Sequence, residues 1–358
     1  MFSPSLHFRY VAKLYFYNLL AILFGLSSAF AVIDYFQHIQ DLNVSSNYQI
    51  LYIFYMWQEA LGLLYPLAIV FAVIMTKLSL VKSNTMGAFH AFGYNKKRLF
   101  LPIFSVVILT YGIFVGLNTT EFAYAKDKAE VLLANEINAY DVNDVFFKYN
   151  DTFVYVKKLD PIKKTLSDIT IFKVEGHQVR YTIRAQTAEY DNGEWEAKDA
   201  TLKTHIYKNG KLVKYKVEHK ASITTLHGYK PKILTSLYEG KALNIIDAYH
   251  TWQLFQEQGL NSDKIRAVLY NKIIVPLFSI ALALILFFKL PFHARMMSLG
   301  SVIALSLGAT FIIWGILFGL NQMGSNGVLI PELSAILPIA LLLLYAIFVY
   351  VTDEKRIA

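Results

Sequence analysis

Cysteine is absent from this sequence of 358 residues, and so are the common motifs of nucleotide, metal and serine-hydrolase chemistry. Without cysteine the chain forms no disulfide and no thiolate metal site. The Gly-Lys pairs at 210–211 and 240–241 lack the loop and the hydroxyl residue of a P-loop, so we do not expect the chain to hydrolyse ATP. The nine histidines are scattered without a His-x-x-x-His pair, and no Gly-x-Ser-x-Gly elbow occurs. These absences disfavour an enzyme.

Charged residues are also missing from six long apolar stretches. Asp, Glu, Lys and Arg do not occur in the ranges 14–33, 60–76, 99–120, 273–288, 296–319 and 333–352. A helix needs about 20 apolar residues to cross a bilayer, and the two shorter stretches reach that length if Glu59 or Lys272 lies in the interface. The sequence therefore predicts a polytopic α-helical membrane protein with six spans. No carboxylate or histidine lies within these stretches, which disfavours a proton-driven carrier and an intramembrane enzyme.

Basic residues near the ends of the six stretches lie on one side of the membrane. The short segments 34–58 and 320–332 contain no Lys or Arg, whereas the opposite side carries eleven. These eleven are Arg9, Lys13, Lys77, Lys82, Lys96, Lys97, Arg98, Lys289, Arg295, Lys355 and Arg356. Because Lys and Arg accumulate at cytoplasmic ends of spanning helices, we expect both termini to be cytoplasmic. Ala29-Phe30-Ala31 resembles a signal-peptidase site, but five spans follow, and we expect the first span to stay uncleaved.

The polar segment 121–263 is then outward-facing, and its composition is typical of an all-β domain. Five segments rich in β-branched and aromatic residues are separated by turn clusters, namely 152–156, 169–174, 180–185, 200–207 and 212–217. Their spacing predicts an antiparallel sandwich or jelly-roll, in which we expect Phe153 and Tyr155 to be core residues rather than ligand contacts. A helical extension from Thr120 to about Asn138 precedes the strands, and helical periodicity over 243–272 follows them.

The predicted domains are three in chain order. Residues 1–120 form the first three spans and a short cytoplasmic helix, residues 121–263 form the outward β domain with flanking helical segments, and residues 264–358 form the last three spans. The net charge of +8 reflects the topology and a lysine-rich outer domain. We do not interpret it as nucleic-acid binding.

A segment near 84–93, between the second and third stretches, combines helix signals with aromatic residues. Ser83 or Asn84 can cap a short helix and Gly93 can end it. The i, i+3, i+4 spacing of its apolar residues predicts one protruding apolar face. A helix lying on the cytoplasmic leaflet is one interpretation; we favour a coupling helix that docks into an ATPase, because exposed Phe residues are costly unless a protein groove receives them. The candidate coupling residues are Asn84, Thr85, Met86, Phe89, His90, Phe92 and Gly93.

Three basic residues lie at the outer entrance of the fourth span, namely Lys264, Arg266 and Lys272. Long basic side chains often extend towards lipid head groups without binding a specific ligand, and this is one interpretation. The other is that the set pairs with the anionic head group of a substrate.

Six short motifs occur in a characteristic order along the chain. They are Arg9-Tyr10, the segment 83–93, Gly193-Glu-Trp-Glu-Ala-Lys-Asp199, Tyr270-Asn-Lys-Ile-Ile-Val-Pro-Leu277, Leu290-Pro-Phe292, and Gly327-Val-Leu-Ile-Pro331 followed by Leu337-Pro338. With the order of three spans, a β domain and three spans, they resemble the LptF/LptG permease family of lipopolysaccharide export. Locally the chain is most similar to the LptG branch.

The resemblance implies a permease subunit of an ABC transporter in the bacterial inner membrane, with a periplasmic β domain. Such a subunit extracts lipopolysaccharide and passes it to a periplasmic bridge. The implied partners are an LptF-like sister permease in a heterodimer, an LptB-like cytoplasmic ATPase dimer that binds ATP-Mg, and LptC-like and LptA-like periplasmic β proteins. No cofactor is expected on this chain itself.

Two departures from the family pattern modify these expectations. Relatives usually have an acidic residue where this chain has Asn84-Thr85, so the contact with the ATPase should be more apolar. Relatives often have basic residues at the outer end of the first span, where this chain has Asp34, so phosphate binding should shift to Lys272 and its neighbours or to the partner. The alternative function is a non-transporting membrane scaffold whose outward β domain recruits partners; substrate-stimulated ATPase activity on co-expression distinguishes the two.

Overall fold

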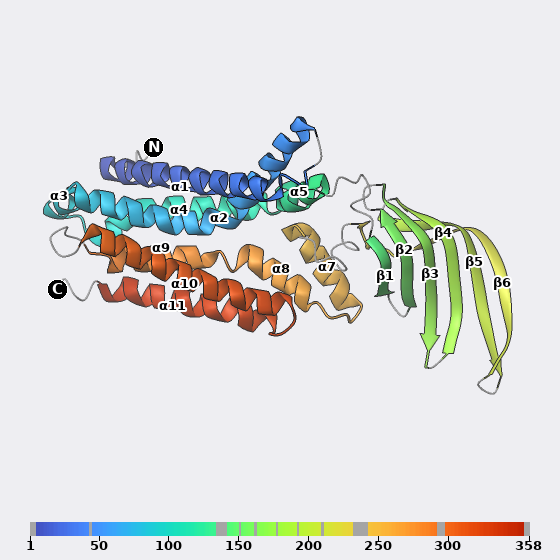
Figure 1. Ribbon diagram of the computed structural model, residues 1–358. Helices are drawn as coiled ribbons and strands as arrows, with labels where there is room; N and C mark the ends of the chain where they lie inside the picture. Colours follow the sequence, from blue (N-terminus) through green and yellow to red (C-terminus); the bar gives the residue numbers. More distant parts are fainter. Residues whose placement is uncertain are drawn as a thin grey trace. The chain divides into compact units, whose positions relative to one another are not determined.

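The computed structural model describes residues 5–42, 45–133, 142–149, 152–160, 163–176, 178–191, 193–208, 211–231, 243–291 and 298–353. The chain divides into two compact units, a helical unit of residues 1–40, 45–129 and 262–358, and a β unit of residues 41–44 and 130–261 (Figure 1). Among the described residues, six helices are long and apolar enough to cross a membrane. The predicted membrane protein with six spans and a β domain inserted between the third and fourth is confirmed.

The spanning helices extend beyond the charge-free stretches of the sequence. The helices of this part are α1 (Leu6–His38), α2 (Ser46–Lys82), α3 (Thr85–Ala91), α4 (Lys96–Leu117), η1 (Glu121–Tyr124), α5 (Ala125–Leu133), α8 (Asp263–Ile273), α9 (Leu277–Lys289), α10 (Leu299–Ser325), η3 (Glu332–Ile336) and α11 (Leu337–Thr352). Most of the predicted connection 34–58 is therefore helical. Its polar groups bond between the two helices: the Tyr52 hydroxyl donates to Asp34, and the Tyr35 hydroxyl donates to Gln49 at 3.1 Å. These bonds let α1 and α2 continue past their apolar stretches.

The core of the helical unit surrounds α2. Residues 67–74 of α2 are buried on all sides of the helix. One apolar cluster joins α2 mainly to α1, α3, α4 and α9, and a second joins it to α9, α10 and α11. A charge introduced at Ala72, which is completely buried, would disrupt this packing, because an unpaired charge in an apolar core is costly.

The fourth span is interrupted by Pro276. Proline has no N–H, so the i→i−4 ladder is broken between α8 and α9. The Leu277 N–H bonds to the Ile274 carbonyl, and the Tyr111 hydroxyl of α4 donates to the freed Ile273 carbonyl at 2.8 Å. A neighbouring helix thus supplies the missing donor, as membrane helices require.

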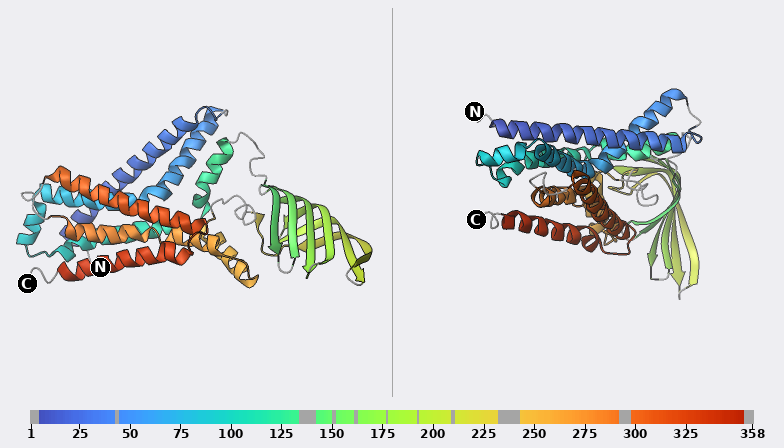
Figure 2. Two further views of the ribbon diagram at one scale, coloured as in Figure 1. Left: turned by 60° about the horizontal axis from the view of Figure 1, so that its bottom comes forward. Right: turned by 60° about the vertical axis from the view of Figure 1, so that its left-hand side comes forward.

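The described strands of the β unit form one antiparallel sheet in which each strand pairs with the next in the chain. They are β1 (Val142–Tyr149), β2 (Thr152–Asp160), β3 (Thr165–Glu175), β4 (Gln178–Asp191), β5 (Glu194–Lys208) and β6 (Lys211–Thr225). The sheet is strongly curved (Figures 1 and 2). The described strands follow one another in a single sheet, the order of a meander, whereas a sandwich or jelly-roll has two sheets. β1 was not among the predicted strands. Strand pairs such as Val154↔Ile171 and Leu166↔Ala188 place the apolar residues on one face.

Our assignment of Phe153 and Tyr155 to the core of the β unit was wrong. Side chains alternate between the faces of a strand, and Val154 and Val156 are the β2 residues that are buried. Phe153 therefore lies on the opposite face, where its ring stacks against that of Phe146 at 5.8 Å. Aromatic residues on this face pack against one another rather than into the core.

Trp195 and Tyr229 close the buried face of the sheet. The Trp195 indole N–H donates to the Tyr229 carbonyl at 2.6 Å, and the Tyr229 hydroxyl donates to the Gln258 side chain at 2.8 Å. Burial raises the pKa of Tyr229, so its hydroxyl stays protonated as a donor. Leu254 of α7 (Ile245–Glu257) packs against the same core.

Helical segments lie on either side of the strands, as predicted. Before the strands, η1 and α5 cover Glu121 to Leu133, and the remainder of the predicted extension lies outside the described residues. After the strands, the helix predicted over 243–272 is divided into α7 and α8. Gly259 has a φ of 62°, and the Leu260 N–H bonds back to the Phe255 carbonyl at 2.9 Å. This left-handed glycine ends α7 as a C-terminal cap.

Candidate functional site

The predicted short helix near 84–93 exists as α3, and residues of unusual backbone conformation mark both its ends. Asn84 precedes it with a φ of 54° and makes no side-chain capping bond. Gly93 follows with a φ of 80°, and its N–H bonds to the His90 carbonyl at 2.9 Å. The Asn95 side chain then accepts from the Arg98 N–H and begins α4. Two sharp turns therefore fix α3 between α2 and α4.

The orientation of α3 differs from the predicted one. We expected Met86, Phe89 and His90 to protrude, but Met86 is completely buried and Phe89 is half-buried against the same core. Phe89 also contacts Tyr94, with the ring centroids 5.7 Å apart. The exposed apolar side chain is Phe92, which is 80% exposed. The residue spacing identifies the apolar side of α3 correctly. This side packs against the helical bundle, however, and does not protrude towards a partner.

The exposed surface of α3 adjoins the beginning of α1. A groove of about 720 Å³ lies between them, lined by Leu6, His7, Arg9, Tyr10, Lys13, Phe89, Phe92 and Tyr94. The ring of His7 in α1 lies 4.4 Å, between centroids, from the ring of Tyr94 in the turn between α3 and α4. Figure 1 shows that the start of α1 and the end of α11 lie at the same end of the helical unit as α3. This end combines exposed aromatic and basic side chains.

A buried lysine connects α2 to the end of α9. Lys77 is completely buried, and its ammonium donates to the Phe287 and Leu290 carbonyls. Pro291 follows and lacks the N–H that a continuing helix would offer to the Phe287 carbonyl. Lys77 supplies this donor. The sequence showed Lys77 only as one of the basic residues at the ends of the spans.

The three basic residues at the start of the fourth span have different surroundings. Lys264 is exposed. The Arg266 guanidinium donates to Asp263 and to Glu332, and the Tyr270 hydroxyl also donates to Glu332 at 2.9 Å. The charge of Arg266 is therefore balanced by carboxylates. The three residues do not form one cationic cluster.

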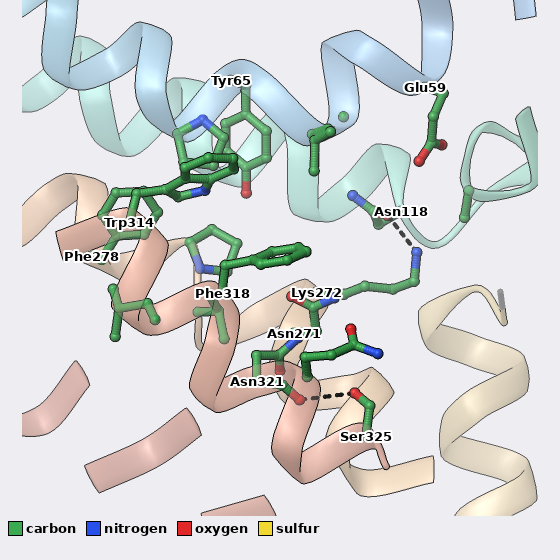
Figure 3. A pocket seen from close by; sticks show the side chains of 18 of the residues that line it. Glu59, Tyr65, Asn118, Asn271, Lys272, Phe278, Trp314, Phe318, Asn321 and Ser325 are labelled. Carbon is green, nitrogen blue, oxygen red and sulfur yellow. Dashed lines mark hydrogen bonds between the residues drawn. The ribbon is translucent and has the colours of Figure 1, made fainter. Parts of the chain in front are cut away.

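Lys272, the third of these residues, extends into a cavity of about 250 Å³ within the helical unit. Its ammonium donates to the Asn118 side chain at 3.0 Å. The cavity is lined by Glu59, Gly62, Leu63, Tyr65, Pro66, Asn118, Phe122, Ala123, Asn271, Lys272, Val275, Pro276, Phe278, Trp314, Leu317, Phe318, Asn321, Gln322 and Ser325. Figure 3 shows the lysine and amides on one side of this space and the rings of Phe278, Trp314 and Phe318 on the other. The cavity is amphiphilic, as a site for part of a lipid would be.

Sequence reasoning identified Lys272 but not Tyr65, Trp314 and Asn321, which line the same cavity. Tyr65 lies on α2, and Trp314 and Asn321 lie on α10. They are distant in sequence from Lys272, and no motif connects them. The available signals were a tyrosine beside Pro66 and an asparagine at the end of an otherwise apolar stretch.

Together these features define a polytopic membrane protein with a short helix at one end of its bundle and an amphiphilic cavity within it. The model of the family described as lipopolysaccharide export system permease LptF/LptG matches residues 9–352. The chain belongs to this family, and its role is in lipopolysaccharide export. No curated protein matches it. Membership of the LptG branch stays a prediction.

Proposed function

We propose that this chain is one permease subunit of an ABC transporter that extracts lipopolysaccharide from the bacterial inner membrane. A sister permease completes the transport cavity, a cytoplasmic ATPase dimer binds ATP-Mg, and LptC-like and LptA-like proteins receive the lipid. The proposal is supported by the family match and by the lack of a P-loop motif in the sequence. The distribution of Lys and Arg favours cytoplasmic termini and a periplasmic β unit.

The observation that carries the motor part of this proposal is the exposure of Phe92, which directly follows the well-anchored α3. An exposed Phe at the end of a short helix gains free energy if a groove on a partner receives it. Buried Met86 ties α3 to the bundle, and tight turns connect it directly to α2 and α4. Movement of the ATPase would therefore pass through α3 to both helices. Because Asn84 and Thr85 are uncharged, this contact is mainly apolar.

The lipid part of the proposal assigns the phosphate contact mainly to Lys272. Its ammonium faces a cavity that the Glu59 carboxylate also lines, whereas Arg266 donates directly to Asp263 and Glu332. Lys264 is exposed and contributes to the attraction of anionic head groups at long range. Arg266 holds α8 against η3 and positions Lys272.

The β unit passes the lipid onward to periplasmic β proteins, whose strands pair with the strands at its edges. Within the described strands, β1 and β6 each pair on one side. Exposed apolar side chains lie along β6, namely Leu212, Val213, Tyr215 and Val217. An unpaired edge with apolar side chains suits both strand addition by a periplasmic β protein and contact with acyl chains.

The motor contact is tested by Phe92→Asp in the co-expressed transporter. We expect loss of ATPase co-purification and of lipid-stimulated ATP hydrolysis, because a carboxylate cannot enter an apolar groove. Phe92→Leu should retain both, and Phe146→Asp, which alters an exposed Phe of the β unit, is the matched control. Retained ATPase binding and stimulation in Phe92→Asp would contradict docking through α3. A wild-type complex whose ATPase never responds to lipopolysaccharide would favour the scaffold alternative.

A further inference from the structure

Two buried polar atoms that line the cavity have no hydrogen-bond partner among the residues that the structure describes. They are the Tyr65 hydroxyl and the Asn321 side-chain carbonyl oxygen. Tyr65 is 1% exposed and Asn321 is 7% exposed. Buried polar groups in folded proteins are nearly always hydrogen-bonded, and leaving one unpaired is costly. Two such atoms on one cavity indicate a ligand that satisfies them.

The Tyr65 hydroxyl is held in place. Its ring stacks on that of Phe114 with centroids 4.2 Å apart and an angle of 3° between the planes. Figure 3 shows the hydroxyl directed into the space beside Trp314 and Phe318. The stacked ring cannot turn away without losing this contact, so the hydroxyl is a fixed donor on the cavity wall.

The chemistry of the lining specifies the ligand. Tyr65 offers a donor, Asn321 offers an acceptor, Lys272 offers a cation, and Glu59 adds a carboxylate whose charge interacts with that of Lys272. A hydroxyl group accepts from Tyr65 and donates to Asn321, and it also suits the reversed orientation of the amide. A phosphate suits Lys272, because hydrogen bonds between ionised partners are the stronger ones. The aromatic rings of the other wall suit the first methylene groups of an alkyl chain.

We propose that this cavity binds the phosphorylated, hydroxyl-bearing head group of a membrane lipid, with the phosphate at Lys272 and a hydroxyl between Tyr65 and Asn321. The inference rests on the lipid contact proposed for Lys272 and adds the residues that read the rest of the head group. A volume of about 250 Å³ far exceeds the roughly 10–15 Å³ that one water needs. The lipid is either the exported glycolipid or a resident phospholipid with glycerol hydroxyls.

The test measures lipid binding to the full chain, purified in detergent with any partner subunits that co-purify. Three probes are titrated and followed by the shift of the thermal unfolding midpoint: phosphatidylglycerol, purified lipopolysaccharide, and phosphatidylcholine, whose head group has a phosphate but no hydroxyl. The variants are Tyr65→Phe, Asn321→Leu and Lys272→Met. The matched controls are Tyr15→Phe, which removes a buried hydroxyl that bonds to the Ile69 carbonyl, and exposed Lys264→Met.

The expected results follow from the lost hydrogen bonds. Tyr65→Phe and Asn321→Leu should each weaken binding about fivefold, and Lys272→Met should weaken it about tenfold or more. Phosphatidylcholine should bind more weakly than the hydroxyl-bearing probes. Without lipid, Tyr65→Phe should unfold at the same or a higher temperature than the wild type, because it removes an unpaired buried hydroxyl. The controls should not alter the lipid-induced shift.

The two lipid arms identify the source of the ligand. Variant-sensitive binding of phosphatidylglycerol alone indicates a resident phospholipid, and variant-sensitive binding of lipopolysaccharide indicates the exported glycolipid; either result supports the inference. If Lys272→Met weakens binding but Tyr65→Phe and Asn321→Leu do not, the phosphate contact of the proposed function stands and this inference is overturned. Binding that is unchanged in all three variants would overturn both for this cavity, while docking through α3 would be unaffected.

Discussion

Two lysines lie near opposite ends of the fourth span and differ in what surrounds them. Lys77 comes from α2 and is enclosed at the end of α9, where its ammonium donates to two backbone carbonyls. Lys272 belongs to α8 and extends into a cavity, where its described hydrogen bond goes to the Asn118 side chain. Both ions are within spanning helices, where an unpaired charge is costly. Lys272 lines a cavity, whereas Lys77 is completely buried.

Lys77 has a structural role, whereas Lys272 is the cation that we propose to contact lipid. Pro291 leaves a helix-end carbonyl without a backbone donor, and Lys77 meets this need. Near Lys272, the need created by Pro276 is met by Tyr111 of α4. The ammonium of Lys272 is therefore not required by the adjacent break in the helix. Lys272 bonds instead to the Asn118 side chain, has Glu59 and Asp127 as charge neighbours, and lines the cavity in which we propose that lipid binds.

The largest effect on stability is expected for Lys77→Met. Methionine fills a similar volume but leaves the Phe287 and Leu290 carbonyls without this donor. An unpaired buried group costs about 1–3 kcal/mol, so we expect the free energy of unfolding to fall by about 3 kcal/mol. The loss of stability is measured as a lower midpoint of thermal unfolding in detergent. Lys82→Met, which removes an exposed lysine from the end of the same helix, is the control. An equal unfolding midpoint in the two variants would show that Lys77 is not a structural link.

An intermediate effect is expected for Arg266→Met. The guanidinium bonds to Asp263 and Glu332 and is 25% exposed, so solvent screens part of the interaction. We expect a loss of about 2 kcal/mol, because hydrogen bonds to charged groups contribute about 1.5–3 kcal/mol. A double-mutant cycle with Glu332→Gln isolates the pair. Purely additive effects would mean that Arg266 and Glu332 do not hold α8 to η3.

The overall architecture was predictable because membrane insertion leaves a local signal. Charge-free stretches identified all six spans, and β-branched segments identified five of the six strands. β1 was missed because Asn143 and Asp144 interrupt its short apolar run. The helical part of 34–58 was missed because it depends on bonds between helices, such as that from Tyr52 to Asp34. Strand order in one sheet also depends on pairing that composition does not reveal.

The candidate sites were predictable only in part. The limits of α3 followed from Asn84 and Gly93, but its rotation did not, because the apolar spacing of Met86 and Phe89 is the same whether that side faces the bundle or a partner. The sequence singled out Lys272 as a candidate head-group contact, whereas Lys77 was only a basic residue at the end of a span. A proline within a span indicates that a backbone carbonyl needs a donor from another part of the chain. Which side chain supplies that donor depends on how the helices pack.

The smallest effect on stability, and the sharpest use of the comparison, is expected for Lys272→Met. Lys272→Met removes one hydrogen bond, to the Asn118 side chain, so the free energy of unfolding without lipid should fall by only about 1 kcal/mol. Lys264→Met, which removes an exposed lysine, should be neutral. The two variants should differ when lipid is added, since only Lys272 lines the cavity. Unfolding midpoints with and without phosphatidylglycerol measure both quantities. A loss near that of Lys77→Met would place Lys272 among the structural cations, because a lysine whose removal unfolds the bundle is required whether or not lipid is bound.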